Sequence, residues 1–162
     1  MKWVLAMDTK EGYRRWLLVL VVVYVLLSIA VFSTYGVRIV NDSHRYLKYA
    51  QRLSEGFYIE PHNVWYFSYV LFVYGVRLLV PGTLATGVVI GQYLLGLLAL
   101  VALTDAGRRL YDSNRAGIAV GFVYCVFVEL TFWHSYVLCE SLYVSGVCFL
   151  LWSAVRLEHR RS

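Results

Sequence analysis

Two acidic residues, Asp42 and Glu140, lie directly beside long apolar runs of the sequence. Asp42 follows the first run, within the stretch Arg38–Tyr46, and Glu140 precedes the last run. At a membrane surface, one carboxylate can take the proton from an acceptor hydroxyl while that hydroxyl attacks a sugar carbon, and a second carboxylate can hold a metal or order the site. A nearby cation can bind the leaving phosphate. Asp42 and Glu140 are therefore the candidate catalytic pair.

Both acids also have a purely structural interpretation. Aspartate is favoured at the N-cap, so Asp42 can serve only to cap the helix that follows it. An acidic side chain is favourable in the first turn of a helix, which would account for Glu140 at the outer start of the last run. The sequence alone leaves these alternatives open.

Further polar residues are expected on the same face of the membrane. Histidines together with the two acids could complete a divalent-metal site, although their spacings match no tight ligand motif. Arg77 can bind a phosphate or only reach toward lipid headgroups. Glu129, about one turn inside a membrane run, is expected to pair internally with a Tyr or His. The other candidates on this face are Glu60, His44, His62, His134, Arg45, Lys48 and Arg52.

The composition indicates a membrane protein. The chain has 162 residues, of which 60% are hydrophobic and only 15% charged, whereas soluble domains carry about 25% charged residues. Lipid must therefore be part of its solvent. The net charge of +5 comes from basic residues at the ends of apolar runs, which excludes nucleic acid as the expected partner. The cysteines, expected to be small buried hydrophobes rather than a disulfide framework, are Cys125, Cys139 and Cys148.

We predict an all-α fold, a single membrane domain over residues 1–162 with four transmembrane helices. Both termini are expected to be cytoplasmic, because each cytoplasmic segment is then net basic. The first run is expected to be retained, since its length and flanks do not fit a cleaved signal peptide. Gly87-xxx-Gly91 and Gly117-xxx-Gly121 allow close helix approach, or simply reflect how common glycine is in membrane spans. The predicted spans are residues 16–36, 84–104, 116–133 and 141–155.

Two segments of the first external loop are predicted to lie in the membrane interface. Residues 43–56 separate apolar and charged side chains at helical spacing, with Gly56 as the helix-terminating residue. Residues 62–80 are apolar and aromatic but contain Arg77. If residues 62–80 crossed the membrane, the basic loop after residue 104 would lie outside, against the positive-inside rule.

The order of these features forms a pattern along the chain. An external acid is followed by an interfacial helix, a proline-headed aromatic segment, a Gly- and Leu-rich span with a basic end, and a second external turn. The segments that carry the pattern are Asn41–Tyr46, Pro61–Phe67, Arg108–Tyr111, Arg115–Ala119 and His134–Leu142.

This pattern resembles the N-terminal half of the GT-C membrane glycosyltransferases over about residues 14–157. The most similar groups are the users of polyprenyl- or dolichyl-phosphate sugars, such as protein mannosyltransferases and the aminoarabinose transferase of lipid A. The resemblance implies that Asp42 matches the catalytic acid of the family's first external loop and that Glu140 matches the acidic position of the second. It also implies that residues 43–56 and 62–80 match the two juxtamembrane helices.

The resemblance implies an inverting transfer of a sugar from a polyprenyl-phosphate donor to an acceptor at the external face, with membrane lipid as a partner. Members of this family usually continue through many more spans. The alternative expectations are therefore a module completed by a second membrane subunit, a non-catalytic membrane subunit or scaffold, or a truncated relic. The expected location is a multi-pass protein of the plasma membrane.

Overall fold

The computed structural model describes residues 8–56, 61–80 and 82–159, with the side chains of residues 61–63 outside that description. Every element in these residues is a helix, as the sequence predicts. In chain order the elements are α2 (Lys10–Tyr35), α3 (Asn41–Glu55), the 3-10 helix η1 (Pro61–Tyr66), α4 (Phe67–Leu79), α5 (Leu84–Leu110), α6 (Asn114–Val126), α7 (Val128–Trp133) and α8 (Cys139–Glu158).

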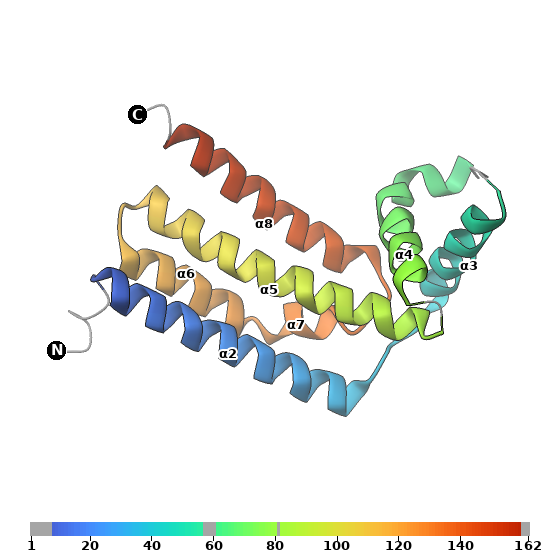
Figure 1. Cartoon of the computed structure of the whole chain (residues 1–162), viewed down its shortest axis with the longest axis horizontal. Helices are drawn as coiled ribbons and strands as arrows, with labels where there is room; N and C mark the ends of the chain where they lie inside the picture. Colours follow the sequence, from blue (N-terminus) through green and yellow to red (C-terminus); the bar gives the residue numbers. More distant parts are fainter. Residues whose placement is uncertain (1–7, 57–60, 81, 160–162) are drawn as a thin grey trace.

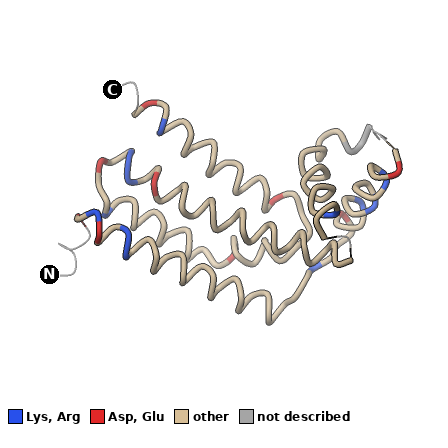
Figure 2. Tube along the Cα trace, viewed as in Figure 1, with Lys and Arg blue, Asp and Glu red and all other residues tan. Residues whose placement is uncertain are grey.

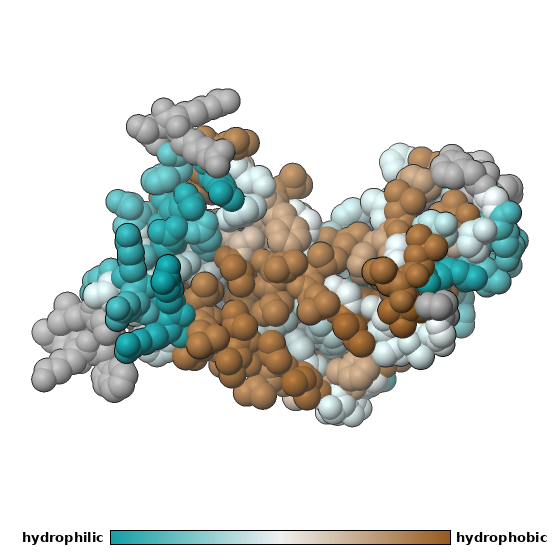
Figure 3. Space-filling view, viewed as in Figure 1, coloured by the Kyte–Doolittle hydropathy of each residue, from teal (hydrophilic) through white to brown (hydrophobic). Residues whose placement is uncertain are grey.

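Three of the described helices, α2, α5 and α8, are long and apolar enough to cross a membrane, with 26, 27 and 20 residues. At 1.5 Å per residue, even the shortest covers about 30 Å, the thickness of the hydrocarbon core. Figure 1 shows them running side by side with α6. A broad band of apolar side chains covers this bundle in Figure 3. An exposed apolar band of this extent is unfavourable in water. The helices therefore indicate a membrane protein.

Charged residues gather at the end of the bundle where α2 begins and where α5 and α8 end (Figure 2). Asp105 joins two helices there: it accepts hydrogen bonds from Arg108 at 2.7 Å and Arg109 at 2.7 Å on α5, and from the Trp152 indole on α8 at 2.9 Å. The charged side chains of Asp105, Arg108 and Arg109 are thus paired with one another. The helix α5 continues through them to Leu110, beyond the predicted membrane span, which ends at residue 104. We call this the basic end, defined by Lys10, Arg14, Arg15, Arg108, Arg109, Arg115 and Arg156.

The predicted span over residues 116–133 is not one continuous helix. Phe127, with φ −74° and ψ 68°, leaves the helical conformation and separates α6 from α7. The amide of Leu130 then donates to the Phe127 carbonyl at 2.9 Å and starts the next turn. The break directs α7 against α2 and buries Thr131 at its inner side. The structure therefore contains one broken helix where the sequence predicts an unbroken span.

α5 is the central helix of the bundle, since α2, α4, α6 and α8 all contact it. Two glycines allow α6 to approach closely. A Cβ atom at Gly117 would lie 2.7 Å from the Thr104 carbonyl oxygen, and one at Gly121 would overlap the Thr104 side chain. The prediction that Gly117-xxx-Gly121 permits close approach is confirmed. Gly87 serves α4 in the same way, because a Cβ atom there would lie 2.9 Å from Val76.

α3 and α4 form a pair beside the end of the bundle opposite the basic end (Figure 1). The apolar face of α3 buries Tyr46, Tyr49 and Ala50, while its charged residues, such as Lys48, stay exposed. These residues belong to one apolar core that includes side chains of α4, the first half of α5 and the segment before α8. The predicted amphipathic helix is confirmed, with bounds shifted from 43–56 to Asn41–Glu55. The predicted 62–80 helix begins as the 3-10 helix η1 and becomes α-helical at Phe67.

Candidate functional site

A backbone pairing holds together the two segments that lead into the helices carrying the predicted acids. The Arg38 amide donates to the Ser135 carbonyl at 2.9 Å, and the Val137 amide donates to the Arg38 carbonyl at 3.1 Å. This is the isolated parallel bridge between Arg38 and Tyr136. Asp42 follows the bridge in the first turn of α3, and Glu140 follows it in the first turn of α8. The bridge therefore fixes where α3 and α8 begin relative to each other.

Asp42 lies in the first turn of α3 and not at its N-cap. The N-cap residue is Val40, whose amide donates to the Ser43 hydroxyl at 3.0 Å. The alternative in which Asp42 caps the helix is therefore wrong, because the side chain that bonds the N-cap amide is that of Ser43. The Asp42 carboxylate is exposed and lies 3.7 Å from Arg45, one turn later. An exposed pair of this kind contributes at most about 1 kcal/mol, so the carboxylate is open to other partners.

Glu140 lies in the first turn of α8 and is also exposed. Its position agrees with the favourable placing of an acid at a helix N-terminus. The neighbouring Cys139 thiol donates to the Glu140 carboxylate at 3.5 Å. Cys139 is itself buried, so it connects an exposed acid to the interior of the molecule.

Tyr46 of α3 contacts the start of α8, where Glu140 lies. Its hydroxyl lies 3.4 Å from the Cys139 sulfur, and its ring packs edge-on against Tyr69 with centroids 4.9 Å apart. Burial raises the pKa of the Tyr46 phenol, the contact with Cys139 raises that pKa further, and the charges of Asp42 and Glu140 act in the same direction. Both carboxylates thus act on the same phenol, which stays protonated at neutral pH. The structure brings Asp42 and Glu140 into the neighbourhood of one buried tyrosine.

Gln92 of α5 connects the segments that surround Tyr46. It is almost completely buried, at 1% exposure. Its carbonyl oxygen accepts from the Tyr69 hydroxyl at 2.7 Å, and its amide nitrogen donates to the backbone carbonyls of His134 at 2.9 Å and Tyr136 at 2.7 Å. One side chain therefore connects α4, α5 and the segment that leads to Glu140. A buried amide with its groups paired in this way holds its neighbours in one geometry.

The structure separates two other candidates from the acids. His134 is buried rather than in an exposed outer turn: its ring stacks on Tyr93, and its Nδ1 bonds with the Leu130 carbonyl. The burial of His134 therefore removes its side chain from any exposed site that Asp42 and Glu140 share. Glu129 is exposed at the start of α7 and has no hydrogen-bond or ion-pair partner in the described part of the chain. The expected internal pairing of Glu129 is wrong because the break at Phe127 turns it outward.

The remaining candidates are spread over α3 and α4. His44, Arg45 and Lys48 are exposed on α3, and Arg52 is half-buried there. Arg77 is half-buried in the last turn of α4. Glu60 and the side chain of His62 lie outside the described residues.

A metal site with three protein ligands is not assembled by the described residues. No group of three or more His, Cys, Asp or Glu side chains in this part of the chain is placed to hold an ion. His134 is turned into the core, and Asp42 faces Arg45. The predicted cysteines, in contrast, are all buried and free, as expected.

Comparison with protein-family models, curated proteins and solved structures finds no match. The geometry of the chain itself therefore carries the functional argument.

Sequence reasoning missed four residues of this region: Tyr46, Cys139, Gln92 and Arg38. Gln92 carried a signal, because a lone amide inside a long apolar run needs buried partners. Arg38 carried another, since it lies close to Asp42 in the chain. Its guanidinium lies 5.8 Å from the Tyr35 ring centre and 5.7 Å from that of Tyr136. Arg38 thus supplies an exposed cation beside the bridge that links the two acids' loops.

Proposed function

We propose that the chain is a GT-C-like membrane glycosyltransferase, or a module of one, that moves a sugar from a polyprenyl-phosphate donor to an acceptor at the external face. The observation that carries this proposal is the contact between the starts of α3 and α8: the Arg38–Tyr136 bridge pairs the segments that precede Asp42 and Glu140, and Cys139 lies 3.4 Å from the Tyr46 hydroxyl and 3.5 Å from the Glu140 carboxylate. In this proposal Asp42 and Glu140 provide a base and a second acid, and Arg38, whose backbone forms the bridge, provides an exposed phosphate-binding cation.

The proposal includes a topology. α2, α5, α6 with α7, and α8 form four membrane crossings, and both termini are cytoplasmic. α3 and α4 lie in the external interface. This arrangement assigns the basic end to the cytoplasm, as the positive-inside rule favours, and leaves Asp42 and Glu140 outside. The membrane is proposed to be the plasma membrane.

In the proposed reaction, the Asp42 carboxylate accepts the proton of the acceptor hydroxyl. The acceptor oxygen forms a bond to the anomeric carbon while the bond from that carbon to the donor phosphate oxygen breaks, with inversion. The leaving phosphate takes the electron pair and is stabilised by a cation, for which Arg38 is the candidate. Glu140 orders the acceptor. No step is assigned to a metal, because the described side chains do not supply a set of three ligands.

The test is the variant Asp42→Asn, assayed for glycan product in cells and in membranes with a polyprenyl-phosphate sugar. Loss of a general base lowers the rate by about 10²- to 10⁴-fold. Glu55→Gln is the matched control, since Glu55 is an exposed acid in the last turn of the same helix. Both variants must reach the membrane in equal amounts. Unchanged product in Asp42→Asn would remove Asp42 from the chemistry.

A second candidate function is a non-catalytic membrane subunit or scaffold. One observation favours it: the cavity beside Tyr69 and Cys139 has a volume of about 270 Å³, and ligand pockets usually measure about 300–1,000 Å³. A sugar-lipid would need a larger site. Purification with a stoichiometric membrane partner, together with normal product in both Asp42→Asn and Glu140→Gln, supports this second function.

A further inference from the structure

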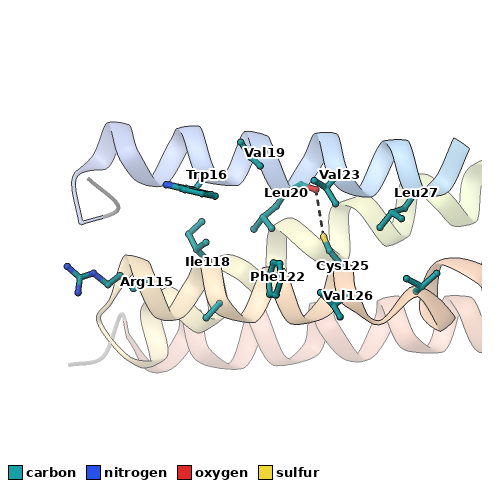
Figure 4. Close-up of a pocket in the computed structure, with 12 residues that line it drawn as sticks. Trp16, Val19, Leu20, Val23, Leu27, Arg115, Ile118, Phe122, Cys125 and Val126 are labelled. Atoms are coloured by element: carbon teal, nitrogen blue, oxygen red, sulfur yellow. Dashed lines mark hydrogen bonds between the residues drawn. The ribbon is translucent and has the colours of Figure 1, made fainter. Parts of the chain in front are cut away.

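A long apolar groove lies between α2 and α6 and has a volume of about 610 Å³ (Figure 4). The Cys125 thiol, which donates to the Leu20 carbonyl at 3.7 Å, is one of the groups that line the groove. The lining has one charged residue, Arg115, at one end. The other residues that line the groove are Trp16, Val19, Leu20, Val23, Leu27, Ile118, Ala119, Phe122, Cys125, Val126 and Val128.

The length of the groove matches one leaflet of a bilayer. Along α2 it extends from Trp16 to Leu27, a helical rise of about 17 Å at 1.5 Å per residue. Half of the hydrocarbon core is about 15 Å thick. On the other wall, the groove ends beside Val128, where the break at Phe127 turns the chain away. A groove of this length accepts one lipid tail and ends near the middle of the membrane.

The polar end of the groove is suited to an anionic headgroup. Arg115 and Trp16 both lie at the basic end (Figure 4), where Trp favours the headgroup region and Arg favours phosphate. Arg115 is paired with Asp8 at 2.5 Å, with side chains 43% and 52% exposed. An ion pair this exposed contributes little, so a lipid phosphate can share or replace it.

We infer that this groove binds an anionic phospholipid, with one acyl chain between α2 and α6 and the phosphate at Arg115. The site is at the basic end, opposite Asp42 and Glu140, so it is separate from the proposed sugar-donor site and does not depend on that function. The lipid fills an apolar space that water does not favour and joins the first helix of the bundle to the broken one.

The first test is native mass spectrometry of the full chain released from bilayers of equimolar phosphatidylglycerol and phosphatidylcholine. The wild-type chain is expected to retain phosphatidylglycerol preferentially. Arg115→Gln is expected to lower that retention about fivefold, the effect of one basic residue near an anionic lipid. Arg15→Gln is the matched control: it removes the same charge at the same end from a side chain that is 82% exposed and is absent from the groove lining. Its retention is expected to be unchanged.

The second test fills the groove instead of removing the charge. Ala119→Trp places a large side chain on the exposed wall of the groove and is expected to abolish retention of phosphatidylglycerol. Leu98→Trp adds the same ring at an exposed position of α5 and is expected to leave retention unchanged. Equal retention of both lipids, or full retention in Ala119→Trp, overturns the proposal. A chain dimer that Ala119→Trp dissociates also overturns it, since a second copy then occupies the groove.

Discussion

Gly96 has the shortest contacts among the glycines whose surroundings are described, and three other elements lie against it. A Cβ atom there would overlap the Tyr24 hydroxyl of α2 and Nε2 of His134, which follows α7. The Tyr124 hydroxyl of α6 donates to the Gly96 carbonyl at 3.2 Å. Because all three partners are buried, none can move aside easily.

We expect Gly96→Ala to destabilise the chain by about 1–3 kcal/mol, the usual cost of overpacking. Gly146→Ala on α8 is the matched control, since its added Cβ atom meets nothing within 4 Å and alanine is favoured in a helix by about 0.5–1 kcal/mol. Unfolding in detergent, followed by circular dichroism, measures both variants. Equal stability of the two variants would contradict the crowding at Gly96.

The candidate site shows how far single residues could be predicted from the sequence. Asp42 and Glu140 could be placed at one face because charge and apolar length are local properties of the chain. The links between them could not be predicted. Tyr46 has the spacing of an ordinary core residue, and only the fold brings it to Cys139. Gln92 was visible as a polar residue in an apolar run, but its partners come from two other segments.

At the scale of elements, the packing of α4 on α5 decides how the site is supported. Gly87 lies against the end of α4, and a Cβ atom at Gly87 would lie 3.6 Å from the Cβ atom of Val80. We expect the pair Val80→Cys and Gly87→Cys to form a disulfide under mild oxidation, because disulfides need Cβ atoms about 3.5–4.5 Å apart. Mass spectrometry of the linked peptides detects the bond.

The control pair is Gly75→Cys with Gly87→Cys. A Cβ atom at Gly75 meets nothing within 4 Å, so this pair is expected to stay reduced. Equal cross-linking in both pairs would show a mobile α4 and contradict the packed arrangement.

Element bounds were predictable where charge or glycine marks an end, and not elsewhere. The first span and α3 begin and end within a few residues of their expected positions, apart from the N-terminal extension of α2 to Lys10. No proline or glycine lies next to Phe127, so the sequence gives no signal of the break. The break goes with a tertiary contact, because the turned helix α7 packs against α2. After this turn, Glu129, which was expected to pair internally, is exposed, and His134, which was expected beside the two acids, is buried.

At the scale of the whole molecule, the separation of the two ends predicts a labelling pattern. Asp112 is exposed at the basic end, and Lys48 is exposed on α3 at the opposite end. A membrane-impermeant maleimide is expected to label Lys48→Cys in intact cells. Asp112→Cys should react only after the membrane is permeabilised, because the proposed topology puts the basic end in the cytoplasm. Labelling of Asp112→Cys in intact cells would contradict the four-crossing topology.

The bridge between Arg38 and Tyr136 has a consequence for biosynthesis. Its two residues are 98 positions apart (136 − 38). Chain synthesis proceeds at about 5–20 residues per second, so about 5–20 s separate the emergence of the two sides. Until then, α3 has no Cys139 to contact, and Asp42 has no Glu140 near it. The starts of α3 and α8 are therefore brought together late in synthesis, and a chain that stalls within α6 would carry Asp42 without Glu140.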